Sequence, residues 1–280
     1  MQAIITGASV GIGRAVCKAY AAAGASVACV ARREADLNTL VEEIKGQGGH
    51  AIAVVADVAA PGAAQHIVAK VESELGPVDI LINNAAISRI SPVVAEPEDL
   101  DIWWRVYEVN VRGPVALIRA VLPSMIDRQT GIVMSVSSNV ATMALPVMTA
   151  YASSKAAISK FHESLSVELE GTGVLSFAVN PGFIRTELGK PQDAINRAAM
   201  DNWAMKAFFD SVSSGSKKTQ SLEVPADTLV ALAAEERCKV LNGKHVTAEK
   251  NLEEILREAE KEGGGRIGKE RLYLVNIGML

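Results

Sequence analysis

The sequence contains few residues of the kinds that stabilise secreted proteins or bind metal ions. Its four histidines do not have the spacing of metal ligands, so we expect no metal site. The three cysteines are far apart and form no C-x-x-C pair: Cys17, Cys29 and Cys238. Thiols in this arrangement are typical of a reducing compartment, and we therefore expect a cytoplasmic protein with reduced cysteines.

Long apolar runs and an excess of positive charge are also missing. No run approaches the roughly 18 apolar residues of a membrane span, and the apolar N-terminus lacks the charged segment of a signal peptide. The net charge of −4 argues against a surface for nucleic acid or anionic lipid. We expect neither a membrane nor a nucleic acid as partner. The apolar share of 49% is enough to bury a large core.

What the sequence does contain is a regular alternation of short apolar runs with longer helical patterns. Runs that are apolar throughout are typical of a parallel sheet covered on both faces. The predicted fold class is α/β, a doubly wound parallel sheet in a Rossmann-type three-layer sandwich, with one domain over residues 1–280. We expect strands over residues 3–6, 26–30, 50–56, 78–82, 132–136 and 174–179, and helices over 12–23, 34–45, 61–75, 98–126 and 149–170.

The alternation weakens after the sixth predicted strand. Residues 194–209 carry a broad apolar face at helical spacing, from Ile195 through Trp203 to Phe208. This face either packs on the core or covers a substrate as a lid over residues 187–222, and both interpretations stay open. The rest is predicted as a helix over 225–236, a strand over 244–246, a helix over 251–260 and an extended tail over 272–277, with residues 248–280 forming an atypical C-terminal extension.

A glycine-rich loop follows the first predicted strand. Gly7, Gly11 and Gly13 form the pattern G-x-x-x-G-x-G between that strand and a helix. Glycine lets the backbone turn tightly and approach a pyrophosphate, which the positive end of the helix attracts. Residues 7–11 also match G-x-S-x-G, the nucleophile elbow of serine hydrolases. That elbow belongs in the middle of a sheet, whereas one short strand precedes this loop, so we reject Ser9 as a nucleophile.

Two arginines follow the second predicted strand. Arg32 and Arg33 stand where an NAD-dependent enzyme offers a carboxylate to the ribose 2′-hydroxyl. Guanidinium groups bind phosphate through two parallel hydrogen bonds. The pair therefore favours NADP(H) over NAD(H), the alternative being that both arginines are solvated surface residues.

The segment from Ser138 to Lys155 carries the candidate chemistry. Tyr151 and Lys155 are four apart on a predicted helix and share one face, although chance alone often produces such a pair. An ammonium near a phenol favours the phenolate, so we expect a lowered pKa for Tyr151. Ser138 lies upstream, where a loop can bring its hydroxyl beside the tyrosine. Together these groups could protonate a carbonyl oxygen while a hydride reaches its carbon.

These motifs together resemble the short-chain dehydrogenase/reductase family in its single-domain form. The resemblance implies that Tyr151 is the acid/base, that Ser138 holds the carbonyl oxygen and that Asn110 joins a proton relay. Lys155 would also bind the nicotinamide ribose. The matching segments run in order over roughly residues 1–190: Thr6–Gly13, Asp57-Val58, Asn83–Ala86, Asn110, Ser138, Tyr151-x-x-x-Lys155, and Asn180–Gly182 with Thr186.

The resemblance also implies a cofactor site along the first two thirds of the chain. Asp57 would contact the adenine, the strand end at Asn83–Ala85 would lie against the adenosine, and residues 181–186 would pack the nicotinamide. The cofactor-binding residues, predicted from the motifs and this resemblance, are Gly7, Ser9, Gly11, Ile12, Gly13, Arg32, Arg33, Asp57, Val58, Asn83, Ala85, Tyr151, Lys155, Pro181, Gly182, Ile184 and Thr186.

The sequence departs from the family pattern in two places. Ala86 stands where the family usually has glycine, and residues 244–248 replace a closing segment that is rich in glycine. The second departure puts in doubt the tetramer that many relatives form through this end. We therefore expect a homo-oligomer, for which a dimer is better supported than a tetramer.

The whole sequence predicts an oxidoreductase that transfers a hydride between NADP(H) and a carbonyl or secondary alcohol. The pocket walls are expected from residues 87–94, 140–148, 183–184 and the lid, and their apolar character favours a hydrophobic small molecule. The alternative is a non-catalytic NADP(H)-binding regulator on the same fold, which would not need Ser138, Tyr151 and Lys155. A serine hydrolase is a more distant third.

Overall fold

A single parallel sheet organises the computed structural model, which describes residues 1–184, 188, 194–203, 205–207, 210, 214, 219–261 and 267. Its seven strands lie in the order β3-β2-β1-β4-β5-β6-β7, and every neighbouring pair is parallel. The strands are β1 (Gln2–Thr6), β2 (Ser26–Ala31), β3 (His50–Val55), β4 (Ile80–Asn83), β5 (Gly131–Val136), β6 (Val174–Asn180) and β7 (His245–Thr247).

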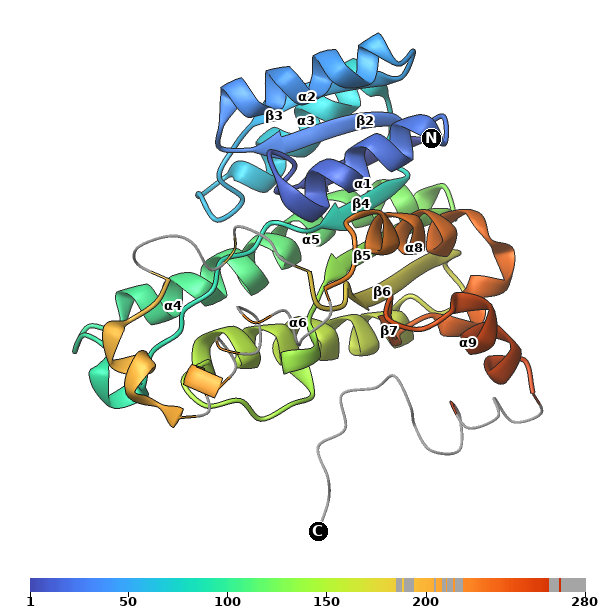
Figure 1. Cartoon of the computed structure of the whole chain (residues 1–280). Helices are drawn as coiled ribbons and strands as arrows, with labels where there is room; N and C mark the ends of the chain where they lie inside the picture. The colour runs from blue at the N-terminus through green and yellow to red at the C-terminus, as the bar shows by residue number, and fades with distance from the viewer. Residues whose placement is uncertain are drawn as a thin grey trace.

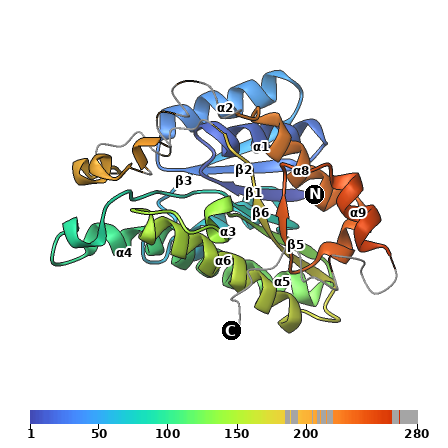
Figure 2. The ribbon, with the colours of Figure 1, turned by 60° about the horizontal axis from the view of Figure 1, so that its bottom comes forward.

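Helices cover both faces of this sheet, as Figure 2 shows. One face carries α1 (Gly11–Ala22), α2 (Glu34–Gly46), α8 (Glu223–Ala234) and α9 (Leu252–Ala259). The other carries α3 (Ala63–Leu75), α5 (Gly113–Asp127) and α6 (Thr149–Glu168), and α4 (Asp101–Tyr107) extends α5 past the sheet (Figure 1). Short helical turns are η1 (Val93–Ala95), η2 (Glu108–Arg112), η3 (Asn139–Ala141), η5 (Arg197–Asp201) and η6 (Glu236–Leu241). The predicted doubly wound α/β fold is confirmed.

The strand order reverses between β1 and β4, which lie side by side in the centre of the sheet. From β1 the chain moves outward to β2 and β3, and from β4 it moves the other way. In open α/β sheets the loops on either side of such a switch point diverge and leave a crevice at the carboxyl ends of the strands. The glycine loop follows β1 and the Asn84-Ala85 pair follows β4, so both predicted cofactor segments border this crevice.

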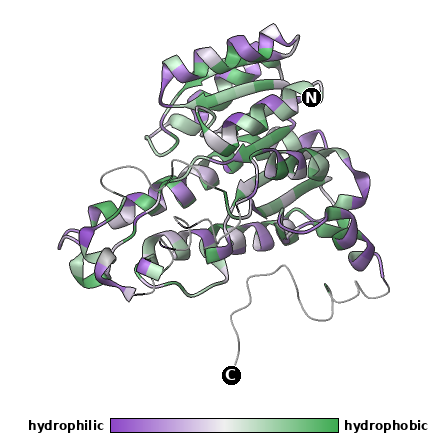
Figure 3. Ribbon diagram, viewed as in Figure 1, coloured by the Kyte–Doolittle hydropathy of each residue, from purple (hydrophilic) through white to green (hydrophobic). Residues whose placement is uncertain are grey.

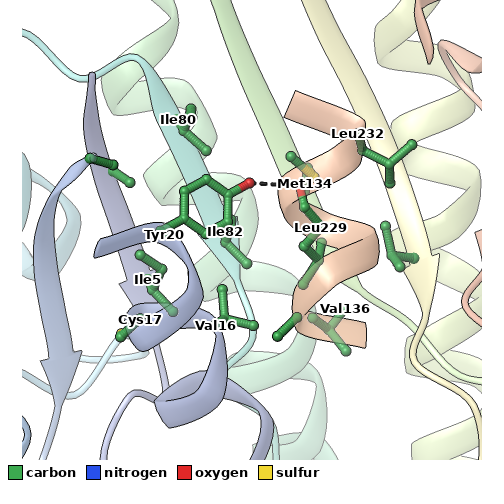
Figure 4. Packing of buried hydrophobic residues seen from close by; sticks show 14 of the residues in the cluster. Ile5, Val16, Cys17, Tyr20, Ile80, Ile82, Met134, Val136, Leu229 and Leu232 are labelled. Atoms are coloured by element: carbon green, nitrogen blue, oxygen red, sulfur yellow. Dashed lines mark hydrogen bonds between the residues drawn. The ribbon is translucent and has the colours of Figure 1, made fainter. Parts of the chain in front are cut away.

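The two cores lie between the sheet and its helices. In Figure 3 the strands are mainly hydrophobic, whereas the outward surfaces of the helices are hydrophilic. Figure 4 shows one core, where α1 and α8 meet over β1, β4 and β5. The ring of Tyr20 is buried there, and its hydroxyl donates a 2.7 Å hydrogen bond to the Leu229 carbonyl. That bond satisfies the one polar atom of the side chain, which makes the burial of its ring favourable.

The long helix predicted over residues 98–126 is present but irregular. It begins at Asp101, widens into the π-helical turn η2 and continues as α5. The stretch Asp101–Asp127 is long and apolar enough to cross a membrane by length and composition alone. Its residues Leu117, Ile118 and Val121 are buried against the sheet, which accounts for its apolar character within the fold.

The helix predicted over residues 194–209 is wrong in its continuity. A 3₁₀ turn, η5, ends at Asn202, whose backbone is extended. The Asn202 Oδ1 atom then accepts a bond from the Met205 N–H, which starts a separate turn. Among the described residues of this segment, Ala199 and Met205 are buried but Trp203 is 81% exposed, so its apolar side chains do not all face the core. Phe208 and the predicted tail over 272–277 lie outside the described residues.

Candidate active site

A cavity of about 1120 Å³ lies over the carboxyl ends of the strands. Gly13, Asn83 and Asn110 lie behind its wall, and Thr186 lies outside the described residues. The other predicted site residues line it: Gly7, Ser9, Gly11, Ile12, Arg32, Arg33, Asp57, Val58, Ala85, Ser138, Tyr151, Lys155, Pro181, Gly182 and Ile184. The fold therefore brings segments that are far apart in the sequence to the walls of one cavity.

The glycine loop forms the floor of one end of this cavity. Gly7 and Gly11 have φ angles of +67° and +58°, a region that favours glycine. A Cβ atom at Gly13 would collide with the Gly7 carbonyl and with the Asn84 amide. The loop therefore needs glycine both for its turn and for the close approach of α1. The N-terminus of α1 begins at Gly11 on the cavity wall, which suits it to an anionic group.

Thr6 and Asn84 join the glycine loop to the end of β4. The backbone amides of Asn84 and Ala85 each donate a 3.0 Å bond to the Thr6 hydroxyl, and the Asn84 side chain donates to the Thr6 carbonyl at 2.8 Å. Asn83 is buried and does not line the cavity, and its amide has no hydrogen-bond partner among the described residues. Asn84 lines the cavity beside the glycine loop, and the role of Asn83 toward a cofactor stays a prediction.

The two predicted arginines lie beside the glycine loop. Arg33 Nη2 donates a 3.1 Å bond to the Ser9 hydroxyl, and its Nε atom pairs with Asp36 at 2.8 Å. Arg32 is exposed and lines the same end of the cavity. Ser9 thus has an arginine as its partner, which agrees with its rejection as a nucleophile. Arg32, Arg33 and Ser9 therefore place two guanidinium groups and a hydroxyl at the same end of the cavity. These hydrogen-bond donors match the oxygens of a phosphate.

Asp57 lies further along the same end. Its Oδ1 atom accepts a 3.0 Å bond from the Ala59 amide, and its Oδ2 atom pairs with Arg105 at 2.6 Å. Arg105 also pairs with Glu108 at 2.6 Å, and it lines the cavity from α4. The sequence analysis did not identify Arg105, because no motif marks it and its partner is 48 residues away.

The candidate catalytic groups lie at the other end, on α6 and the loop after β5. Tyr151 is 8% exposed and Lys155 is 3% exposed. The Lys155 Nζ atom lies 5.7 Å from the centroid of the Tyr151 ring and donates a 2.7 Å bond to the Val136 carbonyl. Tyr151 also has a hydrogen bond with the Ser138 side chain. The hydroxyl, phenol and ammonium predicted from the sequence are therefore brought together.

Burial reverses the pKa shift that the sequence predicted for Tyr151. Loss of solvent raises the pKa of Tyr151 to about 12, and the Ser138 hydrogen bond opposes this only in part. Burial also lowers the pKa of Lys155 to about 8. Both side chains are disfavoured in their charged forms, because an apolar surrounding penalises either charge. The lowering by the ammonium that the sequence predicted is therefore wrong for this structure, in which burial raises the pKa of Tyr151 and the Ser138 hydrogen bond is the contribution that lowers it.

Asn110 lies in η2 with its amide fully bonded. Its Oδ1 atom accepts from the Ile87 amide at 2.9 Å, while Nδ2 donates to the Ile87 carbonyl at 2.9 Å and to Ser154 at 3.0 Å. The residue thereby fixes the loop after β4 to the helix that carries Tyr151 and Lys155. Its participation in a proton relay stays a prediction.

The chemical end opens into a mainly apolar compartment. Its walls come from Ile87, Met143, Leu145, Met148, Phe183 and Leu188. Residues 194–196 are attached to this wall by backbone bonds from the Ile90 amide to the Ala194 carbonyl at 2.6 Å and from the Asn196 amide to the Ile90 carbonyl at 2.8 Å. Among the described residues, no cluster of three His, Cys, Asp or Glu side chains could hold a metal ion.

Comparison with known proteins agrees with this geometry. Residues 1–196 match the family model described as short chain dehydrogenase. The chain belongs to the short chain dehydrogenase family. A short chain dehydrogenase from Pseudocercospora fijiensis is 63% identical over 278 residues, which cover 99% of this chain and 89% of that protein. The 2,3-dihydro-2,3-dihydroxybenzoate dehydrogenase of Bacillus subtilis is 34% identical over 227 residues, covering 81% of this chain and 82% of that enzyme.

Solved structures of short chain dehydrogenases share the fold. A gluconate 5-dehydrogenase from Burkholderia cenocepacia, in complex with NADP and tartrate, superposes with a TM-score of 0.74 at 27% identity. The match covers 88% of this chain and 92% of that one. A short-chain type dehydrogenase/reductase from Mycobacterium marinum gives a TM-score of 0.75 at 28% identity, covering 88% and 92%. Family membership makes this protein an oxidoreductase that uses a nicotinamide cofactor.

Proposed function

We propose that this short chain dehydrogenase transfers a hydride between NADP(H) and a carbonyl or secondary alcohol, with Tyr151 as the acid/base. The observation that carries the proposal is the group formed by half-buried Ser138 with buried Tyr151 and Lys155, at one end of a cavity whose other end is the glycine loop. A nucleotide-binding regulator on the same fold would have no use for a buried phenol and ammonium, whose desolvation is unfavourable.

The residues present fit an NADP(H) molecule. The glycine loop can approach a pyrophosphate closely, because a side chain at Gly13 would collide with the backbone. Ser9, Arg32 and Arg33 would hold the 2′-phosphate, and Asp57 would lie near the adenine. Lys155 would bind the nicotinamide ribose, with Pro181, Gly182 and Ile184 beside the nicotinamide. The NADP bound to the Burkholderia cenocepacia relative supports this choice.

The cofactor, when bound, supplies or accepts the hydride, and the protein manages the proton. In reduction, the Tyr151 hydroxyl donates its proton to the carbonyl oxygen, and the Ser138 hydroxyl stabilises the negative charge that develops there. A pKa of about 12 keeps the phenol protonated at neutral pH, as an acid requires. The Lys155 ammonium stabilises the phenolate that remains. In alcohol oxidation the same phenolate accepts the proton.

The apolar compartment supports a hydrophobic substrate. Methionine and leucine side chains from residues 143–148 and the side chains of Ile87 and Phe183 offer few hydrogen-bond partners near the reacting centre. A hydrophobic ketone or alcohol gains free energy by leaving water for such walls. We also propose that the segment over residues 187–222 closes this compartment, since Leu188 and Ala194 line it.

A direct assay tests the proposal. NADPH consumption is measured with a panel of apolar ketones, for the parent protein and for Tyr151→Phe. The variant removes one hydroxyl, so NADPH binding should survive while kcat falls by about 10²–10⁴-fold, as general-acid loss does. A variant that keeps more than about a tenth of the parental kcat would show that Tyr151 is not the acid. A parent that binds NADPH but reduces none of the panel would favour the regulator.

A further inference from the structure

Glu249 lies two residues beyond β7, in the segment where the sequence departs from the family pattern. Its backbone is fixed to the end of β6, because the Ala248 amide donates a 2.9 Å bond to the Asn180 carbonyl. The Glu249 amide donates to the Thr247 hydroxyl at 3.2 Å. The side chain is thereby directed to the chemical end of the large cavity, which it lines together with Asn139 and Gly182.

The Glu249 carboxylate adds bonds between two loops, one after β5 and one after β6, that also contact each other directly. Its Oε2 atom accepts a 2.8 Å bond from Asn139 Nδ2 and a 3.2 Å bond from Asn180 Nδ2. Asn180 Nδ2 also donates to Asn139 Oδ1 at 2.5 Å. The three side chains form a closed arrangement, which we call the amide–carboxylate triangle. Asn180 Nδ2 has two hydrogens and also donates to the Thr247 hydroxyl at 2.9 Å, so its 3.2 Å bond to Glu249 is shared. The main bond of the carboxylate is therefore the charge-assisted one from Asn139.

One corner of the triangle controls the position of Ser138. Asn139 follows Ser138 directly and begins the turn η3, in which the Asn139 carbonyl accepts a 3.1 Å bond from Thr142. The Ser138 hydroxyl accepts a 3.4 Å bond from the Val140 amide in the same turn. A shift of Asn139 would therefore move the hydroxyl that faces Tyr151.

The second corner controls the turn after β6. Asn180 is 1% exposed, and its Oδ1 atom accepts a 3.2 Å bond from the Gly182 amide. Gly182 has a φ of +83°, and a Cβ atom there would lie 2.0 Å from the Gln220 Oε1 atom and 2.8 Å from the Glu249 Cγ atom. The side chains of Gln220 and Glu249 therefore both cover this glycine, which lines the cavity.

We propose that Glu249 is a positioning residue, which keeps the Ser138 loop and the Pro181-Gly182 turn in their relative places for hydride and proton transfer. This inference deepens the proposed function and rests on it. The physical reason is geometric, since a displacement of about 1 Å at reacting groups can lower a rate by about 10²-fold. Glu249 acts through Asn139 and Asn180 and does not itself exchange a proton with the substrate.

Kinetics of three variants provide the first test. Glu249→Ala should lower kcat by about 10- to 100-fold, with the dissociation constant of NADPH changed by less than about threefold. Glu249→Gln keeps an oxygen that accepts both amides and should recover most of the rate. Glu253→Ala is the matched control, because this glutamate binds Arg237 away from the cavity, and its kcat should equal the parental value. Loss of rate in Glu249→Gln as large as in Glu249→Ala would overturn the inference.

A double-mutant cycle tests the route through Asn139. Asn139→Ala removes the carboxylate's shorter bond, so adding Glu249→Ala to it should lower kcat by less than about twofold further. Two fully additive losses would mean that Glu249 acts by some other route.

Hydrogen exchange separates failure of this inference from failure of the proposed function. In Glu249→Ala, peptides that cover residues 139–142 and 181–184 should exchange faster than in the parent, while peptides from α1 should not change. This measurement needs no turnover. Unchanged exchange in both loops would overturn the inference. Faster exchange in Glu249→Ala, together with a parent protein that reduces no ketone, would overturn only the proposed function.

Discussion

The two ends of the cavity follow different electrostatic rules. At the cofactor end the charges are partly hydrated, as the 52% exposed side chain of Arg33 shows, and they pair with nearby groups such as Asp36. At the chemical end Tyr151 and Lys155 are buried, and loss of water shifts both pKa values away from the charged form. At the cofactor end the charged side chains are therefore stabilised by ion pairs and water. At the chemical end desolvation determines the direction of the pKa shifts.

This difference explains why the sequence predicted the wrong direction for the pKa shift of Tyr151 at the chemical end. The spacing of Tyr151 and Lys155 gave their proximity but not their burial. The closest described partner of the Lys155 ammonium is the Val136 carbonyl, a bond that no motif reveals. The direction of the tyrosine pKa shift depends on this surrounding, which is created by the packing of α6 on β5.

After Tyr151→Phe, we expect Ser138→Ala to cause the largest loss of kcat among changes at the chemical end. Loss of a hydrogen bond to the developing oxyanion should lower kcat by about 10²–10³-fold. NADPH affinity should not change, because Ser138 lies at the end remote from the arginines. Steady-state rates and a fluorescence titration of NADPH check this, with Ser153→Ala on α6 as control, because Ser153 does not line the cavity. An equal loss of cofactor affinity would mean that the two ends are not separable.

The raised pKa of Tyr151 predicts opposite pH profiles for the two directions. Oxidation needs the phenolate, whose fraction rises tenfold per pH unit below a pKa of about 12. The initial rate of alcohol oxidation should therefore rise by about 100-fold from pH 7 to pH 9. Reduction needs the phenol, which is already protonated over this range, so Tyr151 adds no pH dependence to this direction. The reduction rate should instead fall as the pH passes the Lys155 pKa of about 8, because the charge that stabilises the remaining phenolate is lost. An oxidation rate that is flat above pH 7 would mean that the Lys155 charge outweighs desolvation when the cofactor is bound.

A third prediction sharpens the description of the cofactor end. Arg33→Met should weaken NADPH binding by about 10- to 100-fold, because a charge-assisted contact to the 2′-phosphate is lost. NADH lacks that phosphate, so its affinity should change by less than about threefold. Arg14→Met is the matched control, since Arg14 pairs with Glu43 and does not line the cavity. Dissociation constants from fluorescence titration decide the matter, and equal weakening of both cofactors would contradict the assignment.

Local patterns made most of the fold predictable. Strands β1 to β6 and their helices lie within a few residues of the predicted ranges, because each depends on its own apolar periodicity. Contacts between distant segments could not be predicted in this way. Glu249 reaches Asn139 across 110 residues, and the break at Asn202 comes from a side chain that competes with the helix for a backbone amide.

The smallest effect we expect is that of Trp203→Ala in the lid segment. Its side chain is 81% exposed and does not line the cavity, so the free energy of unfolding should change by less than about 0.5 kcal/mol. The KM for an apolar ketone should rise by less than about twofold. Met205→Ala is the contrasting variant, because Met205 is 2% exposed in a cluster with Ile90 and Val147.

Removing the buried Met205 side chain should lower the free energy of unfolding by about 2 kcal/mol or more and loosen the wall of the substrate compartment. Thermal or denaturant unfolding, together with KM, distinguishes the two variants. If Trp203→Ala raises KM more than Met205→Ala does while stability is unchanged, the tryptophan folds over the bound substrate. The chemical end would then be closed by a side chain that is exposed in this structure. Its closure would remove further water from Tyr151 and Lys155, so desolvation would depend on the lid segment as well.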